Sequence, residues 1–98
     1  MEIEYKRPDL DRLETERDFT AGFGRDVVKA FRKRIQAIRA AVDERDLYAI
    51  RGNRFEKLKG PRSHQYSMRL NDQWRLIIEI KAATPKNIIL VIDIEDYH

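Results

Sequence analysis

The sequence predicts an α+β fold in a single domain, residues 1–98, with helices packed on a small, mainly antiparallel, twisted sheet. Two observations carry this prediction. One apolar stripe with helical spacing runs through residues 25–42, and three strand-like segments follow at 65–70, 74–81 and 87–95. A chain of 98 residues has room for one modest hydrophobic core. We therefore expect an N-terminal strand and two helices on a sheet that ends in a three-strand meander.

The N-terminal segment predicts one short strand and one short helix. The string IEY at residues 3–5 is compatible with a strand. A helix is expected over residues 8–19, because Pro8 suits a first turn and acidic residues near the start complement the helix dipole. The string FTAGFG, residues 19–24, ends this helix.

Residues 25–42 carry the clearest helical pattern. The apolar stripe of this helix consists of Val27, Val28, Phe31, Ile35, Ile38 and Val42. Its other face is mainly basic and consists of Arg25, Lys29, Arg32, Lys33, Gln36 and Arg39. We interpret this basic face as solvated surface, with a binding surface as the alternative.

An irregular connection is expected over residues 46–65, because Gly52, Gly60 and Pro61 interrupt it. Four apolar side chains should anchor this connection to the core: Leu47, Ile50, Phe55 and Leu58. The last strand, 87–95, is almost continuously apolar, which indicates a strand covered on both faces.

The register of the first antiparallel hairpin follows from its alternation. The apolar residues of both strands share one face only if position 70 lies opposite position 74, with Arg69 opposite Arg75. This leaves a three-residue loop in which Asn71 or Asp72 is expected at positive φ. A two-residue turn would bury the guanidinium of Arg69 beside Trp74, which costs too much free energy. Arg69 and Arg75 should therefore stand side by side on the exposed face, where their repulsion suggests a shared anion or a nearby acid.

The net charge of +3 is concentrated in one quarter of the chain. Within residues 51–75 the basic side chains are Arg51, Arg54, Lys57, Lys59, Arg62, Arg69 and Arg75, and the acidic ones are Glu56 and Asp72. A concentrated basic segment is typical of a protein that binds a polyanion, and a solvated loop is the alternative.

Composition excludes several classes of site. Cysteine is absent, so the chain has neither disulfides nor thiolate metal ligands. No apolar stretch approaches the roughly 20 residues that span a bilayer, and the N-terminus lacks the apolar core of a signal peptide. We expect a cytoplasmic protein that needs no cofactor, no metal and no membrane.

The C-terminal half and the end of the chain carry a family resemblance. The strings GNRFEKLKG, QYSMRLNDQWR and EDYH resemble the HigB-type toxins of the RelE/ParE superfamily, closely over residues 50–98 and loosely before them. The resemblance implies a compact RelE-like α+β fold and a ribosome-dependent mRNA endonuclease that cuts mRNA in the ribosomal A site. It also implies inhibition of translation and growth, and neutralisation by a small HigA-like helix-turn-helix antitoxin.

The resemblance assigns catalytic roles to matching positions. Lys59 matches the loop lysine, Arg75 the arginine after the strand tryptophan, and Arg69 a second strand arginine. Tyr97 and His98 match the terminal aromatic and imidazole. The sequence departs from the family pattern at two places. Pro61 can change the direction of Arg62, and the KAATPKN loop is longer than usual.

The same residues suit RNA cleavage through the 2′-hydroxyl. This reaction needs a base for the hydroxyl proton, cations around a phosphorane, and an acid for the departing 5′-oxygen. We expect His98 to be the base, because imidazole titrates near neutral pH, and Arg75 or Lys59 to assist the leaving group. Arg69 adds fixed positive charge, and Tyr97 stacks on a base or hydrogen-bonds the phosphate. A final strand antiparallel to the one before it would bring the chain end to Arg75.

Several of these residues also have purely structural interpretations. Tyr97 can cap the core, and a terminal His98 is often idle. The acids near the end, Asp93, Glu95 and Asp96, could hold a metal, but pairing with arginines or orienting His98 fits better. Trp74 is a base-stacking candidate whose alternation favours core packing.

Further contacts to mRNA and ribosomal RNA are expected from Arg54, Lys57, Arg62, His64, Asn71 and Gln73. Two other functions remain open with this fold: a ParE-like toxin that poisons gyrase, and a non-catalytic RNA- or ribosome-binding module. The apolar residues Ile3, Phe19 and Phe23 belong either to the core or to an antitoxin contact.

Overall fold

The computed structural model describes residues 1–96. Its elements are, in order, β1 (Ile3–Tyr5), α1 (Pro8–Thr15), α2 (Arg25–Ala40), α3 (Glu44–Ala49), the 3-10 turn η1 (Arg51–Asn53), β2 (Glu56–Lys57), the 3-10 turn η2 (Gly60–Arg62), β3 (Gln65–Arg69), β4 (Trp74–Lys81) and β5 (Ile88–Asp96).

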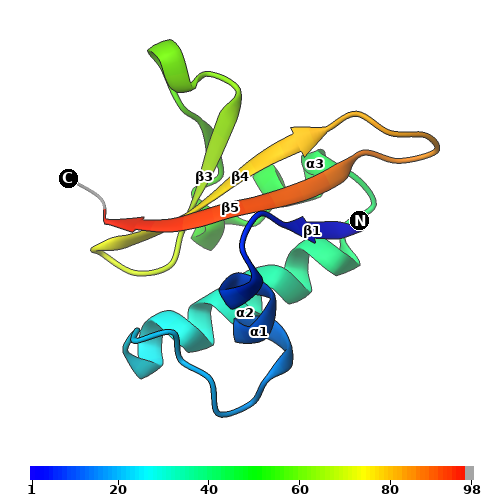
Figure 1. Cartoon of the computed structure of the whole chain (residues 1–98). Coiled ribbons are helices and arrows are strands. Elements are labelled where there is room, and N and C mark those ends of the chain that lie inside the picture. The colour runs from blue at the N-terminus through cyan, green and yellow to red at the C-terminus, as the bar shows by residue number, and fades with distance from the viewer. Residues whose placement is uncertain (97–98) are drawn as a thin grey trace.

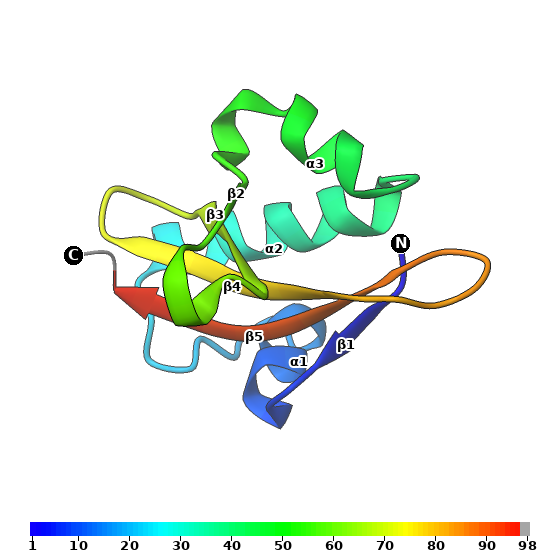
Figure 2. The same cartoon turned by 90° about the horizontal axis from the view of Figure 1, so that it is seen from above.

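The five strands form one mixed sheet in the order β1-β5-β4-β3-β2, with β4 at its centre. β1 runs parallel to β5, and all other neighbours are antiparallel. Helices α1 and α2 cover one face of this sheet, and the segment that carries η2 rises above the other face (Figures 1 and 2). The predicted α+β class, the three strands and the meander of β3, β4 and β5 are confirmed.

Helix α2 buries its predicted stripe under the sheet, except at the last position. Five stripe residues are buried in the core: Val27, Val28, Phe31, Ile35 and Ile38. The prediction for Val42 was wrong, since this side chain is 61% exposed. The helix ends at Ala40, before the next turn would carry Val42 inward. At this end the amino group of Met1 donates hydrogen bonds to the carbonyls of Ile38, Arg39 and Ala41 at 2.9–3.0 Å, which joins the start of the chain to the end of the helix.

The predicted irregular connection contains a third helix and a strand. Helix α3 begins after Asp43, whose carboxylate accepts a hydrogen bond from the amide of Arg45 at 2.9 Å as an N-cap. The prediction that Ile50 anchors this connection to the core was also wrong, because its side chain is 45% exposed just after α3. Asn53 is buried in this region, and its amide donates to the carbonyl of Leu47 at 3.2 Å.

The other three anchors are fully or partly buried. Leu47 and Phe55 are buried, and Leu58 is half-buried. The half-buried residues Ile3, Phe19 and Phe23 also pack against the core.

The predicted hairpin register is confirmed, whereas the predicted turn conformation was wrong. Arg69 pairs with Arg75, and the amide of Leu70 bonds to the carbonyl of Trp74. Neither loop residue that was expected at positive φ adopts it. The side-chain oxygen of Asn71 instead accepts the amides of Gln73 and Trp74 at 2.9 and 2.7 Å, which closes the turn without a left-handed residue.

A polar network joins β1, α1 and α2 at the edge of the core. Glu14 accepts hydrogen bonds from Tyr5 and, through both oxygens, from Arg39, all at 2.7 Å. The bond from Arg39 lowers the pKa of the Glu14 carboxyl, which therefore stays charged at neutral pH.

No helix within residues 1–96 has the length and apolar character needed to cross a membrane.

Candidate nucleic-acid interface

The face of the sheet opposite the helices carries a row of charged side chains. Strand alternation directs Arg69, Arg75 and Glu95 to this face, because their neighbours Leu70, Leu76 and Ile94 face the core. Arg75 lies between the other two, opposite Arg69 on β3 and opposite Glu95 on β5. We call this row of three residues the charged row.

Arg75 is less accessible than the sequence predicted. It was expected on an exposed face, but it is 8% exposed, while Arg69 is half-buried. Arg75 lies on β4, the central strand, with a neighbouring strand on each side.

Arg69 has the nearby acid that the sequence analysis suggested. Its guanidinium forms an ion pair with Asp72 in the hairpin loop. The carbonyl of Arg69 accepts a hydrogen bond from Arg34 of α2 at 3.0 Å, which fixes the end of β3 against the helical layer. Burial lowers the pKa of Arg34, and the charge of Arg69 lowers it further.

The η2 segment brings a third arginine to the charged row. Arg62 donates to both carboxylate oxygens of Glu95 at 2.9 Å, and its Nε donates to Gln65 at 2.9 Å. The hydrogen bond with Glu95 raises the pKa of Arg62. The sequence analysis expected the terminal acids to pair with arginines, and this is confirmed for Glu95 and for Asp93, which pairs with Arg7 at 2.9 Å.

Strand β5 ends at the same corner of the sheet as the β3–β4 hairpin (Figures 1 and 2). Asp96 pairs with Trp74 in the β4–β5 register, and its carboxylate accepts a hydrogen bond from Gln73 at 3.1 Å. The antiparallel course predicted for the last strand is therefore confirmed. Tyr97 and His98 follow Asp96 in the sequence and lie outside the described residues.

The remaining candidate cations do not all share this face. Lys57 pairs with Tyr66, a residue that packs against the core, so the β2–β3 register directs Lys57 to the helical side. Lys59 is exposed where η2 begins. Arg54 is exposed at the end of η1 with φ of 44°, a left-handed conformation unusual for a residue other than glycine.

Three other candidates make contacts within the fold. The amide of Asn71 donates to Asp26 at 2.8 Å and so joins the hairpin to the start of α2. His64 is exposed, with its Nε2 3.8 Å from a carboxylate oxygen of Glu79. Trp74 is half-buried with its ring edge-to-face on Phe23 at 5.3 Å, which confirms core packing for the tryptophan. Within residues 1–96, no group of three or more His, Asp or Glu side chains is arranged to hold a metal ion.

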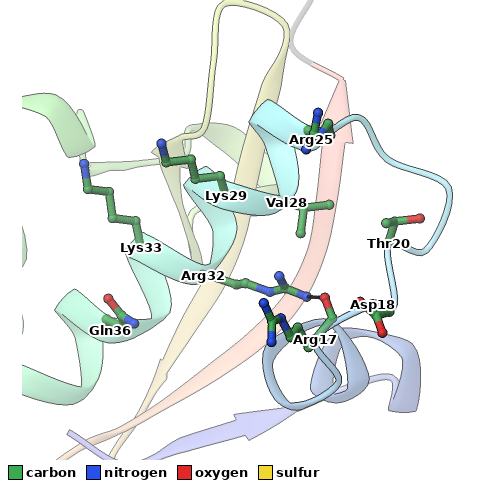
Figure 3. Close-up of a pocket in the computed structure, with 9 residues that line it drawn as sticks. All are labelled: Arg17, Asp18, Thr20, Arg25, Val28, Lys29, Arg32, Lys33 and Gln36. Carbon is green, nitrogen blue, oxygen red and sulfur yellow. Dashed lines mark hydrogen bonds between the residues drawn. The ribbon is translucent and has the colours of Figure 1, made fainter.

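A second basic surface lies on the helical layer, between the α1–α2 loop and α2. It is a cleft of about 670 Å³ (Figure 3), and its cations are Arg17, Arg25, Lys29, Arg32 and Lys33. Arg32 has a structural role, since it donates to the carbonyls of Leu13, Glu16 and Arg17 at 2.9–3.0 Å. In the described part of the chain, the other four cations form no ion pair.

Comparison with protein families decides which family this fold and these residues represent. The sequence model of the HigB-like toxin, described as a RelE-like toxin of the type II toxin–antitoxin system HigB, matches residues 4–98. This chain belongs to that family. The resemblance inferred from the sequence is thereby confirmed. A toxin of a type II system has an antitoxin as its partner.

The structural comparison agrees with this assignment at the level of the fold. The toxin is similar to a YoeB/ParE toxin from Agrobacterium tumefaciens, with a TM-score of 0.65, 17% sequence identity and full coverage of both chains. Among curated proteins, no sequence matches the toxin. The three helices and five-strand mixed sheet therefore represent the RelE-like toxin fold.

Proposed function

We propose that the toxin is a metal-independent endoribonuclease that cuts mRNA in the ribosomal A site and so inhibits translation and growth. The observation that carries this proposal is the side-by-side pairing of Arg69 and Arg75 at the corner of the sheet where β5 ends. Asp72 offsets part of the repulsion between these two like charges, and a bound anion that contacts both guanidinium groups would offset it further. A backbone phosphate is the anion that a guanidinium fork binds best.

The proposed reaction proceeds through the 2′-hydroxyl of the RNA. His98 removes the hydroxyl proton, the 2′-oxygen attacks phosphorus, and the bond to the 5′-oxygen breaks. The products are a 2′,3′-cyclic phosphate and a 5′-hydroxyl, whose proton comes from Arg75, Lys59 or water. Arg69 and Arg75 stabilise the negative charge of the phosphorane, and Tyr97 stacks on a base or hydrogen-bonds the phosphate.

Mapping the 5′ ends of cellular transcripts after toxin induction tests this function. We expect new 5′ ends inside coding regions, in phase with codons, because the ribosome presents mRNA to the toxin one codon at a time. A ParE-like toxin that poisons gyrase would produce DNA breaks and no phased RNA ends. A non-catalytic binding module would bind RNA with strong salt dependence but generate no new ends. Either of these results would contradict the proposed activity.

We further propose that the cleft of Figure 3 contributes electrostatic attraction to ribosomal RNA. Four of its cations form no ion pair within residues 1–96, which supports this role. A lysine or arginine that contacts an RNA phosphate displaces counterions from the RNA, and their release favours binding. Lys29 and Lys33 are exposed and one helical turn apart, so alanine at both positions should preserve α2.

Measuring the affinity of the Lys29→Ala/Lys33→Ala variant for ribosomes across a salt series tests the role of the cleft. We expect weaker binding, and a log–log salt slope reduced by about 1 for each lost phosphate contact. The matched control is Lys6→Ala/Lys86→Ala, which removes the same charge from exposed positions outside the cleft. Equal salt slopes for the two double variants would contradict a role of the cleft in RNA binding and would show that the basic face of α2 is solvated surface.

The antitoxin partner is proposed to be a HigA-like helix-turn-helix protein. This rests on the family assignment, which names the HigB type of toxin–antitoxin system. Co-purification of the toxin with the protein encoded beside it would identify this partner.

A further inference from the structure

We propose that Glu95 is a positioning residue, whose carboxylate holds Arg62 and thereby fixes residues 58–64 over the charged row. This inference rests on the proposed function, because the segment carries Lys59, a candidate catalytic cation. We call the bidentate pair of Arg62 and Glu95 the clasp. Neither the family assignment nor the family resemblance gives a role to Glu95.

The clasp engages the whole guanidinium of Arg62. Both terminal nitrogens reach Glu95 at 2.9 Å, across 33 positions of sequence, and Nε reaches Gln65 at 2.9 Å. Gln65 in turn donates to Glu79 at 3.1 Å. A bidentate arginine–carboxylate pair fixes direction as well as distance, so this contact determines where η2 sits above the sheet.

Few other contacts hold this segment. Every side chain from Lys59 to His64 is exposed, and Leu58 is half-buried. The side chains of Arg62 and Glu95 are 45% and 34% exposed, and ion pairs that solvent reaches this easily contribute little to global stability. Loss of the clasp should therefore free the segment locally without unfolding the domain.

Glu95 also places a negative charge beside the proposed phosphate site, since it lies opposite Arg75 in the register. A carboxylate there repels RNA, so its removal should leave affinity unchanged or increase it. Loss of the clasp should at the same time misplace Lys59, the candidate catalytic cation of this segment, which slows the chemical step. A lower kcat without a higher KM is therefore the signature of a positioning role.

The test compares Glu95→Gln with Asp93→Asn on the full chain. Asp93 is a matched control, because it lies on the same strand, pairs with Arg7 at 2.9 Å and has a side chain 33% exposed. Two quantities are measured for each variant: amide hydrogen exchange of residues 58–64, and kcat and KM for mRNA cleavage on ribosomes.

We expect Glu95→Gln to accelerate exchange in residues 58–64 and to lower kcat by roughly 10- to 100-fold without raising KM. Asp93→Asn should leave both unchanged. The charge swap Arg62→Glu/Glu95→Arg should restore slow exchange, because it rebuilds the pair with its ends reversed. Unchanged exchange and kcat in Glu95→Gln would overturn the proposal. If the wild-type toxin cuts no RNA, the proposed function fails, whereas the exchange measurement still decides whether the clasp fixes the segment.

Discussion

Removal of Tyr97 and His98 is expected to abolish RNA cleavage while leaving the fold of the toxin intact. The strands, helices and buried core that the structure describes consist of residues 1–96, so the shortened chain retains every packing contact described above. In the proposed mechanism His98 is the general base, a role that typically contributes 10²- to 10⁴-fold to a rate. His98→Ala alone should therefore reduce kcat by about 10³-fold.

Two measurements separate this role from a structural one. Thermal unfolding of the shortened chain should match that of the full chain within a few degrees. The cleavage rate of the full chain should fall as the pH drops through the range in which imidazole protonates, and His98→Ala should lose this dependence. Wild-type cleavage by the shortened chain would show that the chain end is not catalytic.

Replacement of Arg75 by alanine is expected to reduce kcat for RNA cleavage by roughly 10²- to 10³-fold, the typical loss when one fixed donor to a developing negative charge is removed. Its central position in the charged row, between Arg69 and Glu95, is the geometric basis for this expectation. Arg75→Lys should recover only part of the activity, because lysine retains the charge but lacks the planar fork.

Folding must be measured alongside activity for Arg75, because this side chain is 8% exposed. Circular dichroism and thermal unfolding identify a variant that loses activity through unfolding. Arg69→Ala is a second test of the same site, because it removes the neighbouring positive charge at a side chain that is only half-buried. Folded Arg75→Ala protein that cuts RNA at the wild-type rate would contradict the assigned role.

The β3–β4 hairpin was predictable because its signals are local. Alternation along neighbouring strands, together with the cost of burying Arg69, was sufficient to fix the pairing of Arg69 with Arg75. Helix α3 was missed because it has only six residues, too few for a periodic pattern, and its signal is the single N-cap Asp43. Val42 was misplaced because helical periodicity does not reveal the residue at which a helix ends.

The candidate site was predictable only in part. Sequence placed the paired arginines and the end of the last strand at one corner, but it did not predict that Arg75 is buried. The burial of a side chain depends on the packing of the whole sheet, which no local pattern shows. The contact of Arg62 with Glu95 joins segments 33 positions apart, and no local pattern predicts such a pair.

The most direct test of the proposed mechanism is the chemistry of the cut ends, determined on mRNA from translating ribosomes treated with purified toxin. Attack by the 2′-hydroxyl predicts a 2′,3′-cyclic phosphate on the upstream fragment and a 5′-hydroxyl on the downstream fragment. Fragments that carry a 3′-hydroxyl and a 5′-phosphate, or mRNA that remains uncut, would contradict it.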